Sequence, residues 1–104
     1  MSGRTVRAKR LKTDPVADRR DLYDAVLSLK ERAEAAAFLR DLCTLAEIRV
    51  FAERLAVARR LSKGMSYRAV ADETGASTTT VTRVAHWLNH GQGGYRTVIE
   101  RLKK

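Results

Sequence analysis

The sequence has few of the residues that support disulfides, membrane spans or large aromatic cores. Its 104 residues include one cysteine, one proline and 6% aromatics. The single Cys43 cannot form a disulfide within the chain, so the protein belongs in a reducing compartment or is indifferent to the redox state. No apolar run approaches the roughly 20 residues that cross a bilayer, and the basic N-terminus lacks the apolar segment of a secretory signal.

Positive charge is abundant and is concentrated at the two ends. The chain carries 21 Lys and Arg against 12 Asp and Glu, a formal net charge of +9. Residues 1–20 hold seven bases and two acids, residues 21–62 seven of each, and residues 63–104 seven bases and three acids. Two basic ends around a neutral segment favour a polyanionic partner, although charge alone does not distinguish lipid from nucleic acid.

Apolar residues recur at helical spacing throughout, so we expect an all-α protein. Asp14 and Pro15 predict a helix start, because proline lacks the N–H group that would be unpaired there. The first helix carries Leu22, Tyr23, Val26, Leu27 and Leu29, and a second over 31–43 is expected to bury Ala35, Phe38, Leu39 and Leu42. The length suits one domain, predicted over residues 14–104 after a basic flexible arm of residues 1–13.

The longest predicted helix begins at a capping box, in which Thr44 and Glu47 pair with each other's backbone N–H groups. Gly64 is expected to end it in the left-handed conformation. Its apolar side holds Leu45, Ile48, Phe51, Ala52, Leu55 and Leu61, and its polar side Arg49, Glu53, Arg59 and Arg60. Cys43, just before the cap, is predicted to be a small buried residue.

Three shorter helices are predicted beyond Gly64, over residues 67–74, 78–89 and 95–103. The glycines of residues 91–94 follow a helix C-terminus, whose carbonyl groups repel anions, so a phosphate-binding loop is disfavoured. The last helix is expected to dock through Val98, Ile99 and Leu102.

Residues 67–86, YRAVADETGASTTTVTRVAH, meet the requirements of a helix-turn-helix. Ala71 is the small residue needed where the two helices cross, and Gly75 accepts the positive φ of the turn. Ser77 can cap the second helix. The apolar residues that would pack the two helices together are Val70, Val81 and Val84.

The outward face of the second helix suits DNA. It carries Thr78, Thr79, Thr80, Thr82, Arg83 and His86. Threonine fits phosphates and thymine methyl groups, while arginine fits phosphates and guanine. Consecutive threonines are weak helix formers, but the first turn tolerates them, and this turn of a recognition helix enters the major groove. DNA binding is therefore favoured over a plain helical corner with a polar face.

The stretch from about Leu22 to Tyr95 resembles the Trp-repressor-related YerC/YecD proteins of bacteria. The resemblance is carried by LYDAVLSLKER, FLRDLCTLAEIR and the helix-turn-helix followed by LNHGQGGY. The tryptophan repressor more distantly shares Gly75, Ala76, Thr80, Val81, Thr82 and Arg83. The resemblance implies a Trp-repressor-like array of about six helices in an intertwined homodimer, which presents two recognition helices to successive major grooves of double-stranded DNA.

The resemblance also implies site residues. Arg68 matches a base-contacting arginine, and Thr80, Thr82 and Arg83 match positions at the DNA surface. The predicted DNA-binding set is therefore Arg68, Ser77, Thr78, Thr79, Thr80, Thr82, Arg83 and His86. In the tryptophan repressor a threonine, two arginines and a serine hold the amino acid. Thr44, Arg54 and Arg83 match the first three, while Trp87 replaces the serine, and its indole is expected to fill the pocket and oppose a tryptophan-like co-repressor.

No catalytic arrangement is found, and we expect neither enzymatic activity nor a cofactor. His86 and His90 share a helix face, but with a distant Cys43 they do not complete a tetrahedral metal site. The leading hypothesis is a sequence-specific DNA-binding transcriptional regulator, most readily a repressor, located in the bacterial cytoplasm at the nucleoid. The alternatives are a protein–protein interaction module and an architectural nucleic-acid binder without sequence preference.

Overall fold

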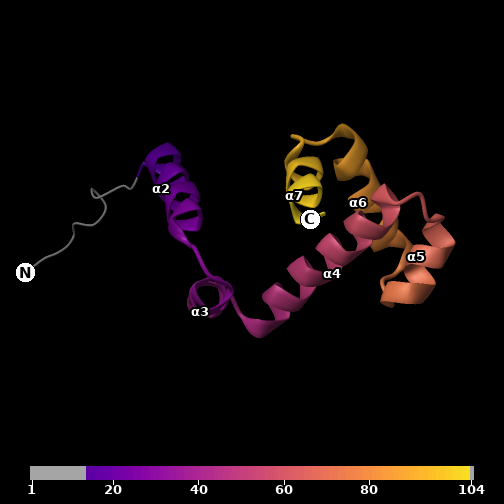
Figure 1. Ribbon diagram of the computed structural model, residues 1–104, viewed down its shortest axis with the longest axis horizontal. Coiled ribbons are helices and arrows are strands. Elements are labelled where there is room, and N and C mark those ends of the chain that lie inside the picture. The colour runs from indigo at the N-terminus through magenta and orange to yellow at the C-terminus, as the bar shows by residue number, and fades with distance from the viewer. Residues whose placement is uncertain (1–13, 104) are drawn as a thin grey trace, which may run out of the picture. The chain divides into compact units, whose positions relative to one another are not determined.

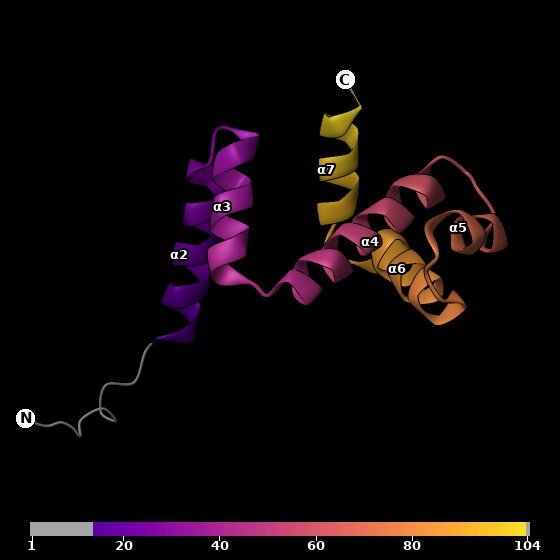
Figure 2. The same ribbon diagram turned by 90° about the horizontal axis from the view of Figure 1, so that it is seen from below.

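The computed structural model describes residues 14–103, and every regular element in this part of the chain is a helix (Figures 1 and 2). The six helices are α2 (Pro15–Ser28), α3 (Arg32–Leu42), α4 (Leu45–Ser62), α5 (Tyr67–Thr74), α6 (Thr78–His90) and α7 (Gly94–Leu102). The all-α prediction and the count of about six helices are confirmed. The arm predicted over residues 1–13 lies outside the described residues. Within residues 14–103, no helix combines the length and apolarity that a membrane crossing requires.

The helix starts follow the capping residues found in the sequence. One carboxylate oxygen of Asp14 accepts hydrogen bonds from the N–H groups of Val16 and Ala17, at 3.0 and 3.4 Å. The Thr44 hydroxyl accepts from the Glu47 N–H at 3.1 Å, and the Glu47 carboxylate accepts from the Thr44 N–H at 2.8 Å. Both caps were predicted, and both satisfy N–H groups that a helix start leaves unpaired.

The contacts within the chain divide it into two compact units, residues 1–42 and residues 43–104. The second unit has a hydrophobic core, in which α4 packs against α5, α6 and α7. The core residues are Val57, Ala58, Val70, Ala76, Val81, Val84, Leu88 and Ile99. Val57, Val70 and Val81 have no exposed surface, so one valine from each of α4, α5 and α6 forms the centre of this core.

The first unit has no buried residue in α2 or α3. The predicted burial on α3 is therefore wrong within a single chain: Phe38 is half-buried, and Leu42 keeps 53% of its surface exposed. On α2, Leu27 is 80% exposed. An apolar helix face becomes buried only when other elements cover it, and the cover within the described part of this unit leaves every side chain at least partly exposed.

In the second unit the differences between predicted and observed burial are smaller. At the start of α4, Leu45 and Phe51 remain about half exposed, whereas Val57 and Ala58, which periodicity did not single out, are buried. On α7 the predicted docking holds for Ile99 only. The remaining two predicted docking residues, Val98 and Leu102, are exposed, and Cys43 is half-buried rather than buried.

Candidate nucleic-acid interface

Helices α5 and α6 form the helix-turn-helix predicted from the sequence. Gly75 ends α5 with φ of +81°, a left-handed conformation that costs a residue with a Cβ about 1–2 kcal/mol. The three predicted packing valines, Val70, Val81 and Val84, are all buried. Ala71 lies partly buried against the core, where the small residue was expected.

Serine hydroxyls begin both helices of this motif. The Ser77 hydroxyl accepts a hydrogen bond from the Thr80 N–H at 3.1 Å, as predicted, and also donates to the Thr80 hydroxyl at 3.1 Å. The Ser66 hydroxyl caps α5 in the same way, through the Ala69 N–H at 3.1 Å. Ser66 was not singled out from the sequence, although a serine directly before a helical stretch is a usual cap signal. These caps fix where α5 and α6 begin.

The candidate DNA-contacting side chains gather on the surface of this motif. The exposed residues of the predicted set are Arg68, Ser77, Thr78, Thr79, Thr82, Arg83 and His86, and Thr80 is half-buried. Only Arg68 comes from α5. The His86 ring meets the rings of Trp87 and His90, each at a centroid distance of 5.3 Å. The face of α6 therefore presents hydroxyl groups, imidazoles and a guanidinium to solvent.

Charge favours an anionic partner for this surface. Helix α6 contains Arg83 and no carboxylate, so no side chain on it repels phosphate. The two acidic residues of the motif are Asp72 and Glu73, both on α5. Across residues 43–104 the sequence holds eleven bases and five acids, against five bases and seven acids across residues 14–42. The basic excess of the described chain thus belongs to the unit that contains the helix-turn-helix.

A cavity of about 380 Å³ lies beside α6. It is lined by Arg54, Thr80, Arg83, Val84, Trp87 and Tyr95. Three of the four predicted pocket residues meet here, while Thr44 is not among the lining residues. Trp87 is 56% exposed and forms part of the wall, so its indole does not fill the cavity as expected. The site therefore combines two guanidinium groups, two hydroxyl groups and two aromatic rings.

Three lining residues, Thr80, Val84 and Tyr95, were not among the predicted pocket residues. Thr80 lies three residues before Arg83 on the same helix, so helical spacing could have placed it there. Tyr95 belongs to α7, beyond the glycine-rich turn, and no sequence signal indicates which way that helix folds back.

Among residues 14–103 no group of three or more His, Cys, Asp or Glu side chains is arranged to hold a metal ion.

Comparison with known proteins identifies relatives along almost the whole described chain. The family model described as Trp repressor protein matches residues 18–103. The uncharacterized protein YerC of Bacillus subtilis (strain 168) is 45% identical over 83 residues, which cover 80% of each chain. A solved TrpR-like protein from Eubacterium eligens ATCC 27750 superposes with a TM-score of 0.77 at 44% identity, covering 90% of this chain and 94% of the other. A proposed Trp repressor from Staphylococcus aureus gives 0.79 at 35% identity, covering 93% and 94%.

Proposed function

This chain belongs to the Trp repressor family, and on that premise we propose that it is a non-enzymatic, sequence-specific DNA-binding transcriptional regulator. Helix α6 enters the major groove, with repression as its expected effect on transcription. The observation that carries the proposal is the helix-turn-helix itself. Three buried valines and the left-handed Gly75 hold α6 with its threonine and arginine face in solvent. Threonine and arginine can contact both phosphates and base edges.

We also propose that the protein acts as a homodimer. The described helices of the first unit bury no residue, so their apolar side chains remain at the surface. A large exposed apolar surface is rare on a monomer. That unit carries a net −2 over residues 14–42, whereas residues 43–104 carry +6, so a second copy offers complementary charge as well as apolar cover. In this dimer the single domain predicted over residues 14–104 has its exposed apolar surface covered by the second copy. A twofold dimer binds half-sites about one helical turn of DNA apart.

Selection from a randomised pool of DNA duplexes tests the DNA-binding proposal. The full chain is expected to enrich a pair of related half-sites at moderate salt, and its affinity is expected to fall steeply as salt rises, because binding releases counterions from the phosphates. Retention without enrichment would indicate an architectural nucleic-acid binder. Failure to retain any duplex would favour the protein-interaction alternative.

Two arginine variants separate base reading from phosphate contact. Arg68→Ala is expected to lose about 1–3 kcal/mol on the selected duplex and to relax the preference at one base pair. Arg101→Ala, an exposed arginine on α7, is the matched control and is expected to leave the sequence preference unchanged. Equal losses by Arg68→Ala on selected and scrambled duplexes would assign Arg68 to the phosphates alone.

The cavity beside α6 supports a second, regulatory proposal: it accepts a tryptophan-like effector. A carboxylate fits between the guanidinium groups of Arg54 and Arg83, and a flat ring fits against Trp87 and Tyr95. Calorimetry with L-tryptophan is expected to show heat of binding that disappears in Arg54→Ala. Absence of heat in the wild-type protein would exclude this amino acid as the effector without affecting the DNA-binding proposal.

A further inference from the structure

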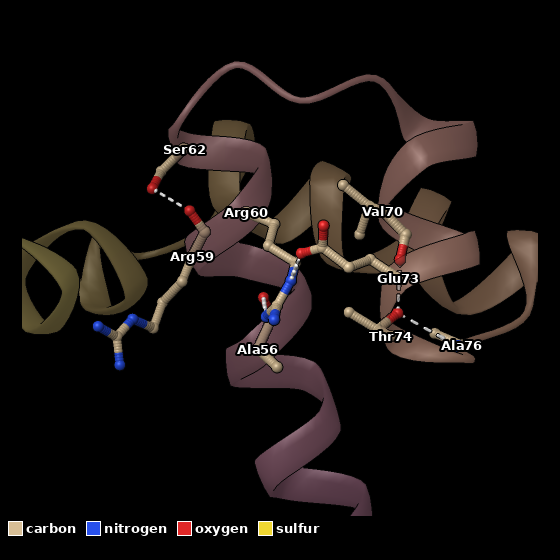
Figure 3. A network of polar contacts seen from close by, with 8 residues as sticks. All are labelled: Ala56, Arg59, Arg60, Ser62, Val70, Glu73, Thr74 and Ala76. Atoms are coloured by element: carbon tan, nitrogen blue, oxygen red, sulfur yellow. Dashed lines mark hydrogen bonds and ion pairs between the residues drawn. The ribbon is translucent and has the colours of Figure 1, made fainter.

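An ion pair connects the scaffold helix α4 to the helix-turn-helix (Figure 3). The Arg60 Nε donates to the Glu73 Oε1 at 2.6 Å. The Arg60 Nη1 also donates to the backbone carbonyl of Ala56, one turn earlier on α4, at 3.1 Å. This second bond holds the guanidinium against its own helix while its Nε points to Glu73. The two residues are thirteen positions apart, and no sequence pattern indicated that they meet.

The ion pair contacts the C-terminal end of α5, where the turn to α6 begins. Glu73 is followed by Thr74, the last residue of α5, whose hydroxyl donates to the Val70 carbonyl at 2.7 Å and accepts from the Ala76 N–H at 3.2 Å. Figure 3 shows these bonds beside the ion pair, at the point where α5 gives way to the turn. Since α6 begins directly after this turn, whatever holds the end of α5 on α4 also limits how α6 can tilt.

Stability alone does not account for this arrangement. The Arg60 and Glu73 side chains are 33% and 55% exposed, and ion pairs in such positions contribute little to folding. A carboxylate on the first helix of a helix-turn-helix also works against DNA binding, because that helix crosses the phosphate backbone. Glu73 is therefore expected to weaken DNA binding, and the small contribution of the ion pair to folding does not compensate for that loss.

We propose that Arg60 and Glu73 are positioning residues that fix α5 on α4 and thereby set how α6 meets the bases. The inference rests on the proposed DNA-binding function and deepens it. The pair raises the ratio of specific to non-specific DNA affinity rather than affinity in general. The bond between the Arg60 Nε and the Glu73 carboxylate suits this role, because a charge-assisted hydrogen bond is directional as well as electrostatic.

Two single variants distinguish an effect of the pair through its charges alone from an effect through the position of α6. If charge alone matters, Arg60→Gln weakens binding to every duplex and Glu73→Gln strengthens it, because the first removes a positive charge and the second a negative one. If the pair positions α6, both variants lower the ratio of affinities for selected and scrambled duplexes. The reversed pair, Arg60→Glu with Glu73→Arg, keeps the net charge and the contact between α4 and α5 but loses the bond to the Ala56 carbonyl, so it is expected to restore most of the ratio.

The experiment measures the affinities of the full chain and these variants for one selected and one scrambled duplex at a single salt concentration. Each single variant is expected to lower the ratio about threefold to fivefold, the range that a partly exposed pair supports. The reversed pair is expected to return within about twofold of wild type. Glu100→Gln, which breaks the Glu100–Lys103 pair within α7, is the control and leaves the ratio unchanged. Opposite affinity shifts with a constant ratio would overturn the proposal.

Amide hydrogen exchange of the free protein provides a readout that does not depend on DNA. The Gly75 N–H bonds the Ala71 carbonyl at 2.9 Å, and the Ala76 N–H bonds the Thr74 hydroxyl. Both amides are expected to exchange faster in the two single variants and at the wild-type rate in the reversed pair. Unchanged exchange in the single variants would refute positioning. A wild-type protein that prefers no duplex would refute the proposed function instead, and exchange would still decide what the pair does.

Discussion

The two units of this chain are both helical, yet only one of them has a core of its own. Helices α2 and α3 bury no residue, while α4 to α7 enclose a core centred on Val57, Val70 and Val81. Composition does not explain this contrast, because α2 and α3 also carry leucine, valine and phenylalanine at helical spacing. The difference is that α4 packs against three other helices, α5, α6 and α7.

The contrast shows that helix formation and burial are separate events in this protein. Capping residues and helical spacing suffice to define α2 and α3, but their apolar sides stay in solvent until another surface covers them. The second unit completes its core within one chain and can therefore hold α6 in place. The proposed homodimer assigns the missing cover of the first unit to a second copy.

The largest effect is expected from a charge placed in the core of the second unit. Val57→Asp buries a carboxylate without a partner, which costs several kcal/mol in a protein whose total stability is about 5–15 kcal/mol. Circular dichroism is expected to show loss of helix or a strongly lowered melting temperature. Arg19→Asp on α2, where the side chain is exposed and polar, is the control and is expected to stay within about 0.5 kcal/mol. Equal losses of stability in the two variants would contradict the conclusion that only the second unit has a core of its own.

The next largest effect is expected on the apolar side of α3. Leu39→Asp places a charge among the residues that a second copy is proposed to cover, and two leucines are lost per dimer. At about 1.5–3 kcal/mol for each buried leucine, the loss is about 3–6 kcal/mol per dimer, so the dimer Kd is expected to rise at least about 100-fold. Sedimentation equilibrium measures this change. Ala37→Asp, on the opposite side of α3 by helical spacing, is expected to leave the Kd unchanged, and a similar shift in both variants would remove the support for this interface.

The smallest effect is expected at the turn of the helix-turn-helix. Gly75→Ala leaves the packing unchanged, since no atom lies within 4 Å of the added Cβ, but it places alanine at φ of +81°. Thermal unfolding is expected to show a loss of about 1–2 kcal/mol. Gly94→Ala, at the first position of α7, also meets no atom within 4 Å and has no positive φ, so it is expected to be neutral or slightly stabilising. A loss at Gly94 equal to that at Gly75 would refute the backbone explanation.

The helix-turn-helix was predicted almost residue by residue because its signals are local. The turn at Gly75, the cap at Ser77 and the three packing valines lie within a short segment, so their spacing alone defines the motif. The cavity beside α6 was predicted less completely. Arg54 and Arg83 were matched through the family resemblance, whereas Tyr95 could not be placed, because its position depends on how α7 returns to α6.

The sequence by itself determined where helices begin and end to within one or two residues, which segment forms the helix-turn-helix, and which family the chain resembles. Each of these depends on residues close together in the chain, through caps, turns and periodic spacing. Only the tertiary structure decided which apolar sides become buried, that Trp87 lines a cavity instead of filling it, and that Arg60 reaches Glu73. These depend on how whole helices pack, and packing joins residues whose separation in sequence carries no signal.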